Sequence, residues 1–164
     1  MGVLITLAQD PGVELAHRER ATELLGRIGG DQIVKPLVDL LKDDPSVRIR
    51  TAAAGVLGEM TAREYEDALQ ALLDDALTDP DKTVRSQATN ALPRTPPSLR
   101  PLLMDALHDK TRDSQVRHVL IDTLGAIGGE EAVAALGQVA RDETEDEAFH
   151  SHANQTLESL RSSW

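Results

Sequence analysis

A chain of 164 residues that has no cysteine and only three aromatic residues, Tyr65, Phe149 and Trp164, must build its core from Leu, Ala, Val and Ile. The missing thiols exclude disulfides and thiolate metal sites, which agrees with a cytoplasmic protein. The balance of 28 acidic against 17 basic residues gives a formal net charge of −11. This balance indicates solvated acidic helix junctions, with a site for a basic partner or a divalent cation as the alternative.

The first apolar segment, Gly2 to Ala8, is too short to cross a bilayer and lacks the basic start of a signal peptide. A thirteen-residue pattern then occurs five times, at intervals of 32 to 35 residues. Its copies begin at His17, Ile49, Val84, Val116 and Phe149. The first, fifth, ninth and twelfth positions are mostly apolar or small and share one face of an α-helix. Each copy is therefore expected to be one amphipathic helix.

A second apolar stretch with helical spacing lies between the copies, so the repeating unit is a helix pair. Gly29 with Gly30, and Gly128 with Gly129, are expected to supply left-handed helix stops. The sequence therefore predicts a single all-α repeat domain, 1–164, of about five helix pairs. The expected repeats are 1–29, 30–60, 61–95, 96–128 and 129–162.

Two copies of the pattern carry a more detailed signature, which consists of Val84, Arg85, Ala88, Ala91 and Leu92, and of Val116, Arg117, Leu124 and Gly125. This signature resembles the second helix of HEAT repeats, particularly the short bacterial and archaeal kind first noted in phycobilin lyases. The resemblance implies a right-handed α-α superhelix whose second helices line a concave groove. It also implies a ladder in which an Asp at the end of each first helix pairs with the Arg of the second. The matching pairs are Asp10 with Arg18, Asp43 with Arg50, Asp79 with Arg85, and Asp109 with Arg117, whereas Asp142 faces His150 in the fifth repeat.

Pro93 stands where three other copies of the pattern have a glycine, and Pro96 and Pro97 follow it. The three glycines are Gly26, Gly58 and Gly125. Because proline interrupts a helix, we expect the second helix of the third repeat to be shortened and the curvature to change there.

No catalytic, cofactor-binding or metal-binding residue is predicted. His150 and His152 are close in sequence, but residues two apart on a helix point about 200° apart and cannot share one ion. His118 occupies the third position of its copy and His150 the second, so these two are not in register. The His-Glu dipeptides that HEAT-like di-iron hydroxylases use do not occur. The chain is therefore expected not to be an enzyme and to hold no cofactor.

With the apolar stripe turned inward, the third and seventh positions of the second helices are expected to face the groove. They include no Lys or Arg, which disfavours a nucleic-acid partner. The sequence therefore predicts a non-catalytic scaffold that binds a protein or peptide in the groove, with a basic segment favoured. The predicted contact residues are Glu19, Glu23, Thr51, Ser86, Asn90, His118, Asp122, Ser151 and Gln155.

The alternative function is a structural or assembly segment of a larger solenoid. Val3, Leu4, Ile5 and Leu7 favour it, because an independent N-terminal cap is expected to have a polar outer face. The chain would then be a monomer or a weak dimer through that end. A lyase-type or a nucleic-acid-binding HEAT protein is less favoured, and no membrane partner is expected.

Overall fold

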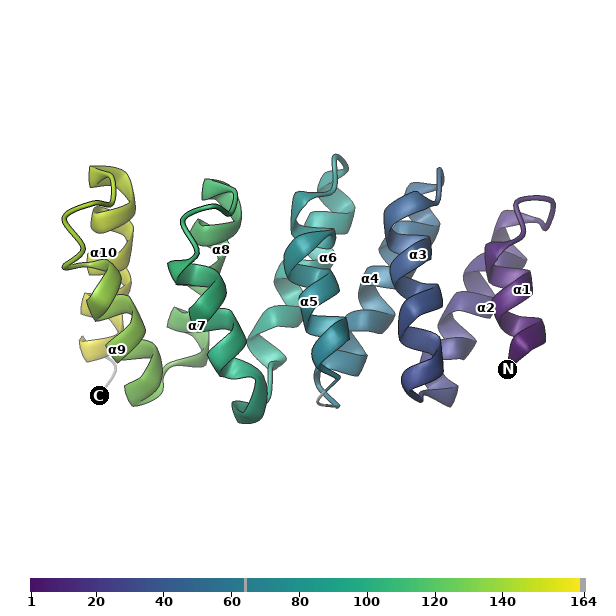
Figure 1. Cartoon of the computed structure of the whole chain (residues 1–164), viewed down its shortest axis with the longest axis horizontal. Coiled ribbons are helices and arrows are strands. Elements are labelled where there is room, and N and C mark those ends of the chain that lie inside the picture. Colours follow the sequence, from purple (N-terminus) through teal and green to yellow (C-terminus); the bar gives the residue numbers. More distant parts are fainter. Residues whose placement is uncertain (64, 163–164) are drawn as a thin grey trace. The chain divides into compact units, whose positions relative to one another are not determined.

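The structure is a computed structural model that describes residues 1–63 and 65–162. Within these residues it has ten α-helices, four short 3₁₀ helices and no strand, which confirms the all-α fold (Figure 1). The α-helices are α1 (Gly2–Gln9), α2 (Leu15–Ile28), α3 (Val34–Asp43), α4 (Val47–Thr61), α5 (Glu66–Asp74), α6 (Lys82–Ala91), α7 (Arg100–His108), α8 (Ser114–Ile127), α9 (Gly129–Val139) and α10 (Glu147–Ser162). The 3₁₀ helices are η1 (Asp31–Ile33), η2 (Ala76–Thr78), η3 (Leu92–Arg94) and η4 (Pro97–Leu99). No helix in the part described is both long and apolar enough to cross a lipid bilayer.

The chain divides into two compact units, Met1–Pro96 with helices α1 to α6 and Pro97–Trp164 with helices α7 to α10. In the first unit, α1, α3 and α5 lie in one layer and α2, α4 and α6 in the other (Figure 1). In the second unit, α7 and α9 lie in one layer and α8 and α10 in the other. Each unit therefore repeats the helix pair that the sequence predicts, and its core lies between its two layers.

The apolar stripe of the second helices forms much of each core. On α4, the side chains of Ile49, Ala53 and Leu57 are fully buried. On α8, Leu120 and Leu124 are at most 1% exposed. Burial of one such leucine stabilises the fold by about 1.5–3 kcal/mol relative to an exposed leucine. Aliphatic side chains at the predicted positions therefore supply most of the packing.

Two of the second helices end at glycine, as the sequence predicts. Gly29 follows α2 with a φ of 72°, and Gly128 follows α8 with a φ of 67°. Residues with a side chain rarely adopt this left-handed conformation, whereas glycine adopts it at little cost. These two stops let the chain turn directly into the first helix of the next pair.

The second helix of the third repeat is short, which confirms the shortening predicted from Pro93. Helix α6 has 10 residues, whereas α2, α4, α8 and α10 have 14, 15, 14 and 16. It ends at Ala91, and Pro93 lies in the following η3. Proline has no N–H to donate to the carbonyl one turn earlier, and its ring collides with that carbonyl.

Three glycines lie where neighbouring second helices touch. They are Gly26, Gly58 and Gly125. A Cβ atom added at Gly58 would lie 2.6 Å from the Cβ of Ala91, and one at Gly125 would lie 2.5 Å from Cγ2 of Thr156. Carbon atoms in good contact are about 3.5–4.0 Å apart. The helices can therefore approach this closely only because these positions have no side chain.

We expect Gly58→Ala to destabilise the first unit by about 1–3 kcal/mol, although alanine is the better helix former by about 1 kcal/mol. The new methyl would meet the Cβ of Ala91, which is fixed to its own backbone and cannot rotate away. Gly55→Ala on the same helix is the control, because its Cβ would approach only the flexible side chain of Gln87, at 3.0 Å. Urea unfolding of both variants would measure the difference. Equal effects would contradict the close helix approach.

A ladder of arginines and carboxylates joins successive repeats in the first unit. Arg18 forms a buried ion pair with Asp44, and its Nε donates to the carbonyl of Ala8 at 2.9 Å. Arg50 donates to the two carboxylate oxygens of Asp79 at 2.8 and 3.2 Å, and to the carbonyl of Asp44 at 3.0 Å. Each of these arginines thus bonds a carbonyl of its own repeat and the carboxylate of the next repeat.

This geometry corrects the ladder that the resemblance implies. The implied Asp–Arg pairs lie within one repeat, whereas the observed pairs join one repeat to the next. The carboxylate of Asp79 binds Arg50 of the preceding repeat, while Arg85 reaches only the carbonyl of Asp79, at 2.7 Å. Asp10 accepts instead from the backbone N–H of Gly12, at 2.8 Å. An Asp that caps its own loop in this way has one oxygen committed locally. Such a carboxylate can still bind the arginine of the preceding repeat, as Asp44 binds Arg18 through Oδ2 and Asp79 binds Arg50 through both oxygens.

The second unit has a similar rung with a different acid. Arg117 donates through Nε to the carbonyl of Leu107 at 2.8 Å, and through its two terminal nitrogens to Glu145 at 3.0 and 2.5 Å. His150 contacts the carbonyl of Asp142 rather than its carboxylate. Glu145, rather than Asp142, therefore supplies the carboxylate of this rung.

The Arg117 hydrogen bond is the main cause that lowers the pKa of Glu145 below its ordinary value of 4.5. The contribution of the charged pair is therefore fully present above about pH 4.5 and is lost as pH falls through the lowered pKa. We expect Glu145→Gln to reduce the free energy of unfolding by about 1.5–3 kcal/mol at pH 7. The difference in the free energy of unfolding between this variant and the unsubstituted protein should become smaller in acid. Denaturant unfolding at several pH values tests this, with the exposed Glu143→Gln as the control; a difference that does not change with pH would contradict it.

Candidate functional site

A hollow of about 620 Å³ lies on the second helices of the first unit. Helices α2, α4 and α6 all contribute to its lining, which includes three of the predicted contact residues, Glu19, Glu23 and Thr51. Ser86 and Asn90 are exposed on α6 but lie outside this lining. The structure thus brings together three of the five contact residues predicted in this unit.

Charged side chains of both signs surround this hollow. Arg48 forms an ion pair with Glu19, and Arg20 pairs with Glu23 at 2.9 Å. With Arg27, the lining holds three arginines beside three glutamates. The third and seventh positions alone predicted a groove without cations. The structure corrects this prediction, because three arginines line the hollow. The arginines occupy other positions of the repeat but have side chains long enough to reach the same place.

Two of the four predicted contact residues of the second unit line a smaller hollow of about 370 Å³. Asp122 and Gln155 line it together with His152. His118 joins this group through a hydrogen bond to His152. Ser151 lies beside the group and accepts a hydrogen bond from Gln155 at 3.3 Å.

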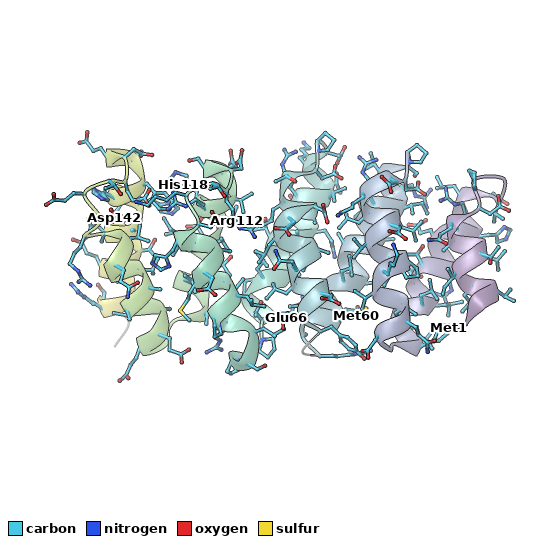
Figure 2. All side chains as sticks on the ribbon, in the orientation of Figure 1. Met1, Met60, Glu66, Arg112, His118 and Asp142 are labelled. Carbon is cyan, nitrogen blue, oxygen red and sulfur yellow. The ribbon has the colours of Figure 1, made fainter. Side chains whose placement is uncertain are left out.

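Asp122, His152 and His118 form one hydrogen-bonded chain between α8 and α10. His118 is the member of this chain that Figure 2 labels. Nε2 of His152 lies 2.7 Å from Oδ1 of Asp122. An ionised carboxylate only accepts, so this nitrogen donates and the neutral His152 ring keeps a lone pair on Nδ1. Nδ1 of His118 lies 2.8 Å from Nδ1 of His152 and donates to it when the His152 ring is neutral. The carboxylate therefore decides which nitrogen of each ring carries the proton.

A buried aromatic ring packs against His118 at one end of this hydrogen-bonded chain. The ring of Phe149 is 1% exposed and meets the His118 ring edge to face, with centroids 5.1 Å apart and an interplanar angle of 76°. The guanidinium carbon of Arg117 lies 4.2 Å from the centroid of Phe149. His118 is thus held against a fixed support, whereas the side chain of His152 is 26% exposed to solvent.

The contact between His118 and His152 is absent from the sequence-based expectations, which compared His118 with His150. In the structure, the seventh position of one second helix faces the fourth position of the next, as Asp122 faces His152. Gly55 and Gln87 are related in the same way in the first unit. This stagger between neighbouring helices is the signal that would have found the histidine pair.

The structure defines the class of the protein as an all-α protein built of stacked helix pairs. A family model for HEAT repeats matches residues 3–93 and 75–157. The chain therefore belongs to the HEAT-repeat family, as its second-helix signature predicted. No curated protein sequence matches it.

Several solved structures are similar to the chain. Human deoxyhypusine hydroxylase in complex with glycerol is 20% identical, and the alignment covers 98% of this chain and 73% of that one with a TM-score of 0.53. The complex of CpcE and CpcF of phycocyanin lyase from Nostoc sp. PCC7120 is 21% identical, with 97% and 81% covered and a TM-score of 0.37. The first likeness supports the fold alone, and the second is too remote to add to it.

The similarity to the hydroxylase corrects two expectations, that the chain is a non-catalytic scaffold and that it is not an enzyme. Both followed from motifs missing in the sequence and from the usual use of helical repeats as scaffolds. A fold that aligns with 98% of this chain is that of a hydroxylase, so neither expectation stands. Fold does not imply function, and the shared fold assigns no reaction to this chain.

Proposed function

We propose that the first unit binds a segment of another protein in the hollow formed by α2, α4 and α6. The observation that carries the proposal is the volume of about 620 Å³ on a surface that the sequence already indicated for contact. Ligand pockets in proteins have volumes of about 300–1,000 Å³. The hollow has room for a few side chains and an adjoining stretch of backbone.

The chemistry of the lining supports a peptide as the ligand. Helix α4 contributes small side chains, Thr51, Ala52 and Gly55, over which a backbone can pass closely. The buried hydroxyl of Thr51 makes no hydrogen bond with any residue of the described part. Leaving such a group unpaired costs about 1–3 kcal/mol, and a bound peptide group would recover this energy once the hydroxyl has rotated toward it.

A segment that carries Lys or Arg is the favoured ligand. The whole chain has a formal net charge of −11, which attracts basic segments and speeds their association. At the hollow itself, a ligand cation can replace Arg48 or Arg20 beside the glutamates that they contact. Such binding would serve a substrate protein as well as a stable partner, and a cytoplasmic location is part of the same proposal.

Panning a peptide-display library against the full chain tests the proposal. We expect the selected peptides to lose about tenfold or more in affinity for Thr51→Arg, because the arginine would fill the hollow. Asn90→Arg is the matched control, since it adds the same charge to an exposed position outside the lining. Peptides that bind Thr51→Arg as tightly as the native chain would contradict this proposal. A loss with Asn90→Arg alone would place the binding surface on the outer part of α6.

A further inference from the structure

We propose that His118 and His152 form a binding site for a divalent transition-metal ion in the second unit. The site goes beyond the proposed peptide binding and lies on other helices, α8 and α10. Both Nδ1 atoms come from neighbouring second helices and face each other across 2.8 Å. Imidazole nitrogen is a common ligand of copper, nickel and zinc.

The distance between the two nitrogens discriminates among metals. Metal–imidazole bonds are about 2.0 Å long, so two nitrogens at a right angle around one ion are separated by about 2.8 Å. A tetrahedral angle would require about 3.3 Å. The observed separation of 2.8 Å therefore fits neighbouring corners of a square or an octahedron. Cu²⁺ and Ni²⁺ prefer this geometry, whereas structural Zn²⁺ sites are tetrahedral.

The proton between the two rings need not be lost to the solvent when the metal binds. When both rings are neutral and hydrogen-bonded, Nδ1 of His118 carries a proton and its Nε2 carries a lone pair. For coordination, that proton leaves Nδ1 and a proton is taken up at Nε2, so the ring stays neutral. Small rotations of the two rings then turn both Nδ1 lone pairs toward one ion. The side chain of His152 is 26% exposed, which leaves it room for such a rotation.

Asp122 is the positioning residue of this site. It accepts the Nε2 proton of His152 at 2.7 Å and thereby leaves the lone pair of that ring on Nδ1, where the metal would bind. Carboxylates behind metal-binding imidazoles commonly have this role, and their loss lowers metal affinity by about 10–100-fold. Phe149 supports the His118 ring on its buried side. Asp122 and Phe149 therefore restrict the two rings, and coordination requires only the proton exchange at His118 and small ring rotations.

The site would offer the metal open coordination positions. Among the residues that the structure describes, no three His, Cys, Asp or Glu side chains converge on one point. Two protein ligands leave the other positions to water or to a ligand atom that enters from the adjoining hollow of about 370 Å³. The sequence alone predicted no metal site. The experiments below distinguish that prediction from the two-histidine site.

Isothermal titration of the untagged full chain with NiCl₂, and in parallel with ZnCl₂, tests the site. We expect one Ni²⁺ per chain, bound more tightly than Zn²⁺, and no saturable binding by His118→Ala or His152→Ala. Asp122→Asn should weaken Ni²⁺ binding by about tenfold or more. His150→Ala is the matched control and should bind as the native chain does, because that histidine contacts the Asp142 carbonyl instead.

Electron paramagnetic resonance with one equivalent of Cu²⁺ identifies the ligand atoms directly. Hyperfine splitting from two nitrogens is expected in the native chain and in His150→Ala. His152→Gln, which can still hydrogen-bond to Asp122, should lose this splitting while its melting temperature without metal stays near the native value. The proposal is wrong if the native chain binds neither Ni²⁺ nor Cu²⁺, or if His152→Gln binds them equally well. Either result would show that His118 and His152 form a hydrogen bond and no metal site. Unchanged affinity in Asp122→Asn would overturn the positioning role.

Discussion

Replacing Asp44 with alanine is expected to lower the free energy of unfolding of the first unit by about 3–5 kcal/mol. Arg18 is 5% exposed and Asp44 is 8% exposed, and the two form an ion pair. The variant would leave the guanidinium of Arg18 buried without its counter-charge, which costs far more than the loss of an exposed pair. It would also remove the acceptor of the Ser46 N–H, which lies 2.9 Å from Asp44 Oδ1. Urea denaturation followed by circular dichroism measures the loss.

The neighbouring Asp43 provides a matched control, because it is the residue that the family resemblance assigns to the ladder. Its side chain is exposed at the end of α3. We expect Asp43→Ala to change the free energy of unfolding by no more than about 0.5 kcal/mol. A loss from Asp43→Ala as large as that from Asp44→Ala would mean that the ladder does not run from each arginine to the next repeat.

Leu57→Ala and Leu124→Ala should each cost about 2–5 kcal/mol, the first in the first unit and the second in the second unit. Leu57 is fully buried and Leu124 is 1% exposed, so truncation removes packed methyl groups and leaves a cavity. Because the two leucines occupy the same position of their repeats, similar losses are expected. Denaturant unfolding or calorimetry of the two variants measures these losses.

Leu24→Ala is the control for this pair of substitutions. Leu24 is half-buried on α2, next to the fully buried Leu25. Its truncation should cost about 1 kcal/mol or less, because water already reaches part of the side chain. Losses below about 1 kcal/mol for both Leu57→Ala and Leu124→Ala would mean that the stripe assigned to the core is not the one that packs.

The two surfaces described above have different chemistry. The hollow of the first unit is rimmed by ion pairs and has small residues at α4, which suits a polypeptide segment. The site of the second unit has two imidazoles and one carboxylate in a hydrogen-bonded chain. A metal ion bound by His118 and His152 would have open coordination positions and could take part in a reaction. The sequence-based expectation of a non-catalytic protein did not include such a centre. The titrations with Ni²⁺ and Zn²⁺ and the peptide panning therefore test separate activities.

The sequence by itself determined the helix pairs, because the properties that specify them are local. The stripe through Ile49, Ala53 and Leu57 is a feature of a single helix and needs no knowledge of its neighbours. The end of α6 before Pro93 and the left-handed turn at Gly29 likewise follow from the backbone chemistry of one residue. The family signature then extended this local description to a stack of repeats.

Only the tertiary structure decided which side chains meet across repeats. The stagger between second helices is set where they touch, as at Gly58 and Ala91, and no single repeat contains that information. Because of this stagger, Arg18 contacts Asp44 of the next repeat and His118 contacts His152. These contacts depend on the offset of one helix against another, a distance that repeat spacing along the chain does not specify, because packing of side chains determines it.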